Sequence, residues 1–174
     1  MFSQDETRLG LMTILRRVIT LAGVKPIFKH QYNFKNFYLY GAVEPESGED
    51  FYLLMPYLNG SCFQIFLDEF SKHFSDSFNC LLVDNGRFHV AKKLVIPHNV
   101  SLIFQPPYSP ELNPIERLWQ HIKEQIALEN FHTLDKLMER VEEIVLTLDK
   151  ETVKSLTSYD YFMTAVQNVK NSKT

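Results

Sequence analysis

Runs of apolar and β-branched residues alternate with polar segments along the first two thirds of the chain, and they predict short strands. The second and third runs are rich in aromatic residues and are joined by residues 44–48 (EPESG), which are typical of a turn, so we expect an antiparallel hairpin. The first run is expected to be the end of a strand that reaches Asp5. Strands are therefore predicted at residues 2–5, 35–43, 50–55, 80–83 and 101–104.

Three further segments carry apolar residues at the spacing of one helix face. The first begins near residues 59–61, where Ser61 and Gln64 have the spacing of a capping box. The second begins near Asn113, and the third follows Thr133, which can cap it. We interpret the stripes as core: Phe63, Phe66, Leu67, Phe70 and Phe74; Ile115, Leu118, Trp119, Ile122 and Ile126; and Leu134, Leu137, Met138, Val141, Ile144, Val145 and Leu148.

The order of these elements fits an α/β fold in which a mixed sheet is flanked by helices. The chain has 174 residues, 45% of them hydrophobic, so we expect residues 1–174 to form a single domain with C-terminal helices at about 133–170. No apolar run approaches the ~20 residues that a membrane span requires. The two cysteines, Cys62 and Cys80, suit a reduced cytosolic protein without a disulfide framework or a zinc site.

Candidate chemistry is concentrated between residues 84 and 119. Asp84 directly follows a predicted buried strand, and Glu116 lies in the first turn of the helix that begins within QPPYSPELNPIERLW (residues 105–119). Carboxylates placed at the carboxyl ends of strands lie where open α/β sheets bind ligands. Each piece also has an ordinary structural interpretation, because Asp-Asn-Gly is strong turn chemistry and Glu116 has the position of a capping-box residue.

Taken together, DNGRFH (residues 84–89) and PPYSPELNPIERLW (residues 106–119) resemble the catalytic core of the mariner-superfamily transposases and their bacterial insertion-sequence relatives, the DDE superfamily endonucleases. The resemblance covers about residues 2–150 and implies a ribonuclease H-like fold. It implies that Asp84 is the second catalytic aspartate and Glu116 the catalytic glutamate. The first should then be Asp5, which is followed by Glu as in the family pattern.

The sequence departs from this family in two places. The spacing between Asp84 and Glu116 is slightly shorter than usual, and the deficit falls in residues 91–99, where a shortened helix or loop would absorb it. Gly86 stands where another small residue such as Ala is common. Neither departure removes a carboxylate.

The resemblance also implies a metal-dependent reaction. Two Mg²⁺ ions, with Mn²⁺ as a substitute, take oxygen ligands, and a pair ~4 Å apart can activate a nucleophile and stabilise a leaving oxygen. Asp5 is expected to bridge both ions, with Asp84 on one and Glu116 on the other, while Asn85 and His89 orient the site. The implied reactions are cleavage of DNA at the ends of an insertion element and transfer of the new 3′ end to target DNA. The protein is expected to be a homodimer.

The charge balance is not that of a strong DNA binder, since the net charge is −3 and the pI is near 6.1. Only four residues precede Asp5, which is short for a central strand, so we expect the helix-turn-helix region that reads the element ends to be absent from this chain. The expected location is the bacterial cytoplasm, on the nucleoid when the protein is bound to DNA. Local basic groups are Arg8, Lys25 and Lys29, and DNA contacts are expected from Arg16, Arg17, Lys92 and Lys93.

Two other functions stay open. One is a ribonuclease H-like nuclease with another substrate, against which the long motif at residues 106–119 argues. The other is a catalytically idle transposase remnant that acts only as a binding or dimerising fragment. The retention of Asp5, Asp84 and Glu116 opposes that interpretation.

Overall fold

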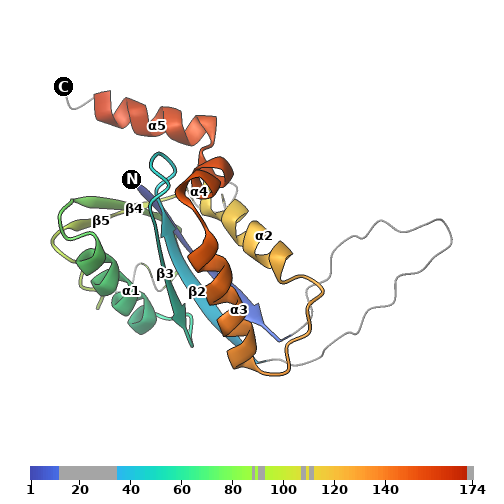
Figure 1. Cartoon of the computed structure of the whole chain (residues 1–174). Helices are drawn as coiled ribbons and strands as arrows, with labels where there is room; N and C mark the ends of the chain where they lie inside the picture. Colours follow the sequence, from blue (N-terminus) through green and yellow to red (C-terminus); the bar gives the residue numbers. More distant parts are fainter. Residues whose placement is uncertain (12–34, 88, 90–92, 107–108, 110–111, 172–174) are drawn as a thin grey trace.

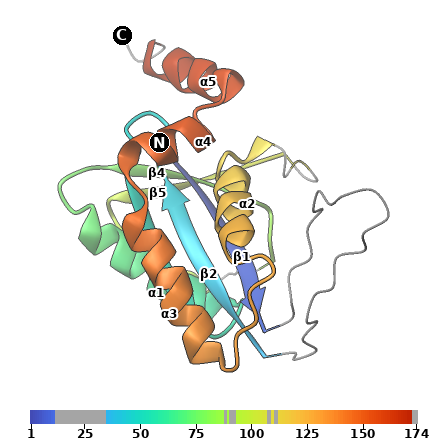
Figure 2. The same ribbon diagram turned by 45° about the vertical axis from the view of Figure 1, so that its right-hand side comes forward.

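A computed structural model of the chain describes residues 1–11, 35–87, 89, 93–106, 109 and 112–171. Its strands form a mixed sheet in the order β3-β2-β1-β4-β5, with α1 on one face and α2 and α3 on the other, while α5 lies beyond α4, away from the sheet (Figures 1 and 2). The elements are β1 (Phe2–Gly10), β2 (Asn36–Val43), β3 (Asp50–Met55), α1 (Gly60–His73), β4 (Asn79–Val83), β5 (Val100–Phe104), α2 (Ile115–Gln125), α3 (Leu134–Thr147), α4 (Lys150–Thr157) and α5 (Asp160–Asn171).

The predicted mixed sheet flanked by helices is confirmed. β2 pairs antiparallel with both β1 and β3, whereas β4 pairs parallel with β1 and β5. The hairpin between β2 and β3 closes through a hydrogen bond from Gly48 N to Glu44 O of 2.8 Å. Gly48 has φ +79°, a left-handed conformation that glycine adopts without steric cost.

β1 is longer than predicted, and the expectation that a strand ends at Asp5 is wrong. The strand continues to Gly10, because Thr7 and Leu9 extend the buried alternation and β2 pairs with it along its length, from Ser3 opposite Val43 onwards. Asp5 therefore lies in the middle of the central strand, opposite Gly41 of β2.

The start of α1 also differs from the prediction. Asn59 caps the helix, since its Oδ1 accepts a hydrogen bond of 2.9 Å from Cys62 N, whereas Ser61 lies exposed inside the first turn. Gln64 has a different role from the expected capping box: its side chain donates to Val95 O and accepts from Val95 N, each at 2.8 Å. Gln64 thus fixes the connection that leads from β4 to β5.

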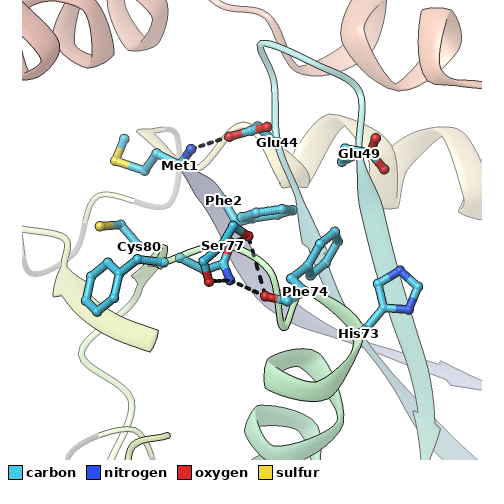
Figure 3. Close-up of a pocket in the computed structure, with 10 residues that line it drawn as sticks. Met1, Phe2, Glu44, Glu49, His73, Phe74, Ser77 and Cys80 are labelled. Atoms are coloured by element: carbon cyan, nitrogen blue, oxygen red, sulfur yellow. Dashed lines mark hydrogen bonds and ion pairs between the residues drawn. The ribbon is translucent and has the colours of Figure 1, made fainter. Parts of the chain in front are cut away.

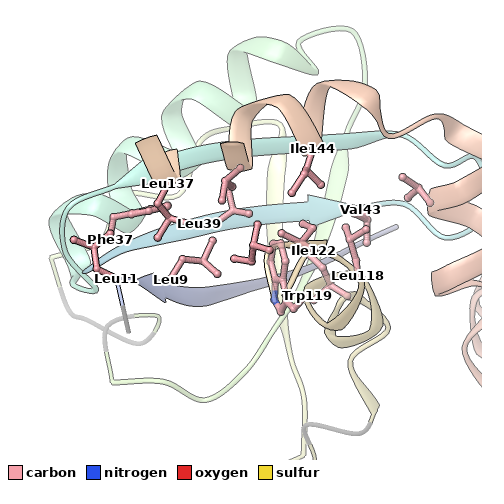
Figure 4. Close-up of a cluster of buried hydrophobic side chains, with 14 residues drawn as sticks. Leu9, Leu11, Phe37, Leu39, Val43, Leu118, Trp119, Ile122, Leu137 and Ile144 are labelled. Carbon is pink, nitrogen blue, oxygen red and sulfur yellow. The ribbon is translucent and has the colours of Figure 1, made fainter. Parts of the chain in front are cut away.

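Two buried clusters form the core, one on each face of the sheet, and the predicted stripes supply their centres. Figure 4 shows the cluster on the α2 and α3 face, where Trp119 packs on the sheet. Gly41 makes this packing possible: a Cβ atom built there would lie 2.5 Å from the Trp119 ring and 2.9 Å from Tyr52. None of the helices in the described parts of the chain is long and apolar enough to cross a membrane.

We expect Gly41→Ala to lower the free energy of unfolding by about 1–3 kcal/mol, because the added methyl group would overpack the contact with Trp119. Urea unfolding measures the change. Ser61→Ala, at an exposed position of α1, is the control and should stay within about 0.5 kcal/mol of the parent. Equal stability of the two variants would contradict the close packing at Gly41.

Candidate active site

Asp5 projects from the middle of β1 toward α2. Successive side chains of a strand point to opposite faces, and Asp5 shares the face of Leu9, which belongs to the cluster around Trp119. The indole Nε1 of Trp119 donates a hydrogen bond of 2.9 Å to Asp5 Oδ2. The sequence marked Trp119 only as a core residue, whereas the structure shows that it also holds the carboxylate of Asp5.

Asn113 anchors the start of α2 to the same strand. It is buried; its Nδ2 donates to Gln4 O at 2.9 Å, and its Oδ1 accepts a hydrogen bond from Ser3 Oγ. The alternative interpretation, in which Glu116 completes a capping box, is not supported, because no hydrogen bond joins the Glu116 side chain to the backbone N–H of Asn113, both described residues. The side chain of Asn113 bonds to β1, and its Oδ1 also accepts a bond of 3.4 Å from Ile115 N, while Glu116 is exposed at the helix start.

Asp5 and Glu116 interact electrostatically. Burial, followed by the negative charges of Glu6 and Glu116, raises the pKa of Asp5 from 3.8 to about 7, although the hydrogen bond from Trp119 acts in the opposite direction. The hydrogen bonds that Asp5 accepts thus offset only part of the effect of burial and of the neighbouring negative charges. A cation bound between these carboxylates would remove that repulsion.

Asp84 lies just after β4, the parallel neighbour of β1. Its side chain is 55% exposed, and its Oδ1 accepts a hydrogen bond of 2.7 Å from Gly86 N. His89 lies behind it, with Nδ1 2.6 Å from the same oxygen. His89 is buried and packs edge-on against Phe63 of α1, with ring centroids 4.4 Å apart.

The other ring nitrogen of His89 faces Glu6, a residue for which the sequence predicted no role. Its Nε2 lies 3.2 Å from Oε1 of Glu6, which points to the face of β1 opposite Asp5. Burial lowers the pKa of His89, but the hydrogen bonds and charges of Glu6 and Asp84 outweigh it and raise the pKa above its ordinary value. The available signal for Glu6 was its place directly after Asp5 in a strand that alternates between two faces.

Asn85 joins the loops that follow β4 and β5. Its Nδ2 donates to Gln105 O at 2.5 Å, and Gln105 N donates to Val83 O at 2.9 Å. Asn85 therefore fixes the backbone beside Asp84. Its role in orienting the site stays a prediction.

The structure brings the predicted carboxylates together in part. Asp5 and Glu116 share one face, and Asp84 follows the next strand, but within the described residues no three His, Cys, Asp or Glu side chains lie close enough to hold a metal ion. Of the predicted DNA-contacting groups, Lys93 is exposed, as is Arg8. Arg16, Arg17 and Lys92 lie outside the described residues, as do Lys25 and Lys29.

A separate pocket of about 420 Å³ opens at the amino end of β1 (Figure 3). Met1, Phe2, Phe74 and Cys80 are among its lining residues, whereas the three predicted catalytic carboxylates are not. The pocket is therefore distinct from the candidate active site.

A mixed sheet with carboxylates on its central strand, after the neighbouring parallel strand and on a helix packed against it defines a ribonuclease H-like domain. The family model described as DDE superfamily endonuclease matches residues 1–138, and the chain belongs to this family. The resemblance inferred from residues 84–89 and 106–119 is thus confirmed.

Solved structures of Mos1 transposase share the fold. The paired-end complex with the left transposon end has a TM-score of 0.71 and 18% identity, covering 90% of this chain and 51% of that chain. The strand transfer complex has a TM-score of 0.69 at 18% identity, with 90% and 50% covered, and the paired-end complex with Mn has 0.70 at 18%, with 90% and 51% covered. The chain thus spans about half the length of these proteins.

A relative in Sinorhizobium fredii (strain NBRC 101917 / NGR234), the uncharacterized protein y4pE/y4sA, is 39% identical over 88 residues. The match covers 50% of this chain and 65% of that protein.

The raised pKa of Asp5 predicts a pH-dependent stability in metal-free buffer. Protonated Asp5 stabilises the fold below pH 3.8, and this contribution is lost as the pH rises through about 7. Asp5→Asn removes the charge but keeps the shape. We expect the variant to be more stable than the parent at pH 8, on the order of 2 kcal/mol, and similar to it at pH 4. Urea unfolding in EDTA at both pH values measures this, and a variant less stable than the parent at pH 8 would contradict it.

Proposed function

We propose that this chain is the catalytic domain of a transposase that cleaves DNA at the ends of an insertion element and joins the new 3′ ends to target DNA. Asp5, Asp84 and Glu116 are its catalytic carboxylates. The observation that carries the proposal is the placement of Asp5 and Glu116 on one face of the sheet, close enough to repel each other, beside a parallel strand that is followed by Asp84. The absence of a capping bond for Glu116 within the described start of α2 further supports a role outside helix capping.

Two divalent cations, Mg²⁺ with Mn²⁺ as a substitute, fit these residues. The donors are all carboxylate oxygens, which hard cations prefer, and a cation would relieve the repulsion that, after burial, raises the pKa of Asp5. Asp5, Asp84 and Glu116 are the residues that would hold the ions. When bound, such ions activate the attacking oxygen and stabilise the leaving oxygen. Mos1 paired-end complexes with Mn and with Mg, which share this fold, support the choice of metal.

The chain's own residues hold the carboxylates in place. Trp119 donates to Asp5, which limits the rotation of that side chain on β1. Asn113 fixes the start of α2 to β1, so that Glu116 stays beside Asp5. Gly86 N and His89 hold the oxygen of Asp84 that they share. Preorganised ligands of this kind lower the cost of assembling the reactive geometry.

DNA is the proposed substrate, bound at the element ends and at the target by a homodimer in the bacterial cytoplasm. The Mos1 paired-end complex with the left transposon end and the Mos1 strand transfer complex, which share this fold, support DNA as the partner. We assign residues 1–174 to one catalytic domain, with the C-terminal helices within 133–170, and place recognition of the element ends in helix-turn-helix modules outside these residues. Arg16, Arg17, Lys92 and Lys93 are the proposed contacts with the DNA backbone.

Nicking of supercoiled plasmid by the full chain tests the proposal without requiring recognition of an element end. We expect nicking in Mg²⁺ or Mn²⁺ and none in Ca²⁺, because Ca²⁺ binds oxygen ligands with a looser geometry. Asp84→Asn and Glu116→Gln should each lower the rate at least about 100-fold, since each removes a charge that would hold a metal ion.

Glu124→Gln is the matched control, because Glu124 is exposed on the same helix as Glu116. It should nick DNA at the parental rate. Circular dichroism should show that all variants are folded. If Glu116→Gln nicks DNA as well as the parent and Glu124→Gln do, Glu116 is not a catalytic carboxylate.

A further inference from the structure

Glu6 is a buried carboxylate that the three-carboxylate site does not use. Its side chain is 4% exposed and projects from β1 to the face opposite Asp5. Burying a carboxylate is costly unless it is paired, so its position on the central strand requires an explanation. Gln4 and His89 supply the pairing: Gln4 Nε2 donates to Glu6 Oε1 at 2.7 Å, and His89 Nε2 lies 3.2 Å from the same oxygen.

His89 continues this set of contacts to Asp84. Its Nδ1 lies 2.6 Å from Asp84 Oδ1 and 3.2 Å from Asp84 O, so the imidazole contacts both the carboxylate and the backbone of that residue. Gln4, Glu6, His89 and Asp84 therefore form one continuous series of polar contacts. The series begins on β1, the middle strand of the sheet, and ends at Asp84, whose side chain is 55% exposed.

The two ends of this series differ in rigidity. Glu6 lies on β1, which pairs with a strand on each side. Asp84 lies after the last residue of β4, and within the part of the chain that the structure describes its Oδ1 is held by Gly86 N and by the ring of His89. The packing of the His89 ring against Phe63 restrains it sterically, and the second polar contact, to Glu6, helps to set the direction in which His89 presents Nδ1.

We propose that Glu6 is a positioning residue that acts through His89 to fix the carboxylate of Asp84 for metal binding. This inference rests on the proposed function, in which Asp84 holds a metal ion. Glu6 does not touch the metal or the DNA; it sets the orientation of the ring that touches Asp84. One strand thus serves the site from both faces, with Asp5 on one and Glu6 on the other.

A purely structural role makes a different prediction. If Glu6 and His89 only attach residues 84–89 to the sheet, replacing Glu6 should change stability without a specific effect on metal affinity. Replacing one member of a buried charged pair usually destabilises a fold, because the other member is left without its partner, so two substitutions of Glu6 are needed. Glu6→Met keeps the volume and removes the acceptor, and Glu6→Gln keeps an oxygen that can accept from His89.

Mn²⁺ titration of the full chain by calorimetry, without DNA, separates the two roles. We expect Glu6→Met to weaken Mn²⁺ binding about 10–100-fold, as replacement of a residue behind a ligand commonly does, and Glu6→Gln to restore most of the affinity. In a His89→Ala background, Glu6→Met should cause no further weakening, because its effect passes through the ring. Tyr40→Phe is the matched control: Tyr40 is buried opposite Glu6 in β2, and its hydroxyl bonds to Tyr57 O rather than to His89.

A second measurement needs no metal. In the ¹⁵N spectrum of the metal-free protein, Glu6→Met should move the imidazole resonances of His89, whereas Tyr40→Phe should leave them in place. Unchanged resonances in Glu6→Met would show that the contact between Glu6 and His89 is absent, and would overturn the inference. This measurement also applies if Glu6→Met proves less stable, since Glu6→Gln can be compared in the same way.

The outcomes distinguish this inference from the function on which it rests. If Asp84→Asn weakens Mn²⁺ binding but Glu6→Met does not, the positioning role is wrong and the proposed metal site stands. If Asp84→Asn leaves Mn²⁺ affinity unchanged, the proposed role of Asp84 is wrong, and the inference falls with it. If Glu6→Met weakens binding equally with and without His89, Glu6 does not act through the ring.

Discussion

The close packing of α2 on β1 is the contact on which the rest of the site depends. Gly41 leaves room for Trp119 to lie on the sheet, and the indole then reaches Asp5. Asn113 joins the start of the helix to the backbone of Gln4. Because these contacts fix the helix at two points, Glu116 comes to lie within electrostatic reach of Asp5. A helix held only by a general apolar stripe could shift along the sheet by small amounts without a comparable loss of contact.

This packing has an electrostatic cost. It buries Asp5 and holds the negative charges of Glu6 and Glu116 near it, and both effects raise the pKa of Asp5. Sites that hold cations are built in this way, because the bound ion converts the repulsion into attraction. The fold tolerates this cost because the pairing of β1 with β2 and the two apolar clusters stabilise the strand that carries Asp5.

The two faces of β1 carry carboxylates with different partners. Its odd-numbered positions from Ser3 to Leu9 face α2, and Asp5 lies among them, while Glu6 faces the α1 side, where His89 packs against Phe63. A strand alternates its side chains by geometry, so adjacent residues can serve the same site from opposite sides of the sheet. The aspartate and glutamate that follow one another in the sequence therefore have different partners.

The sequence by itself determined the mixed sheet, the hairpin, the core stripes and the family, because these depend on periodicity, turn chemistry and motifs that are local in the chain. It also predicted Asp84 and Glu116 as site residues through their place in those motifs. Tertiary structure decided the length of β1, which follows from pairing with β2, and the cap of α1, which falls to Asn59 rather than Ser61. It also decided the partners of Trp119 and Glu6, which lie 114 and 83 residues away in the chain. A side chain's hydrogen-bond partner is set by which elements pack together, and neighbouring residues carry no signal for it.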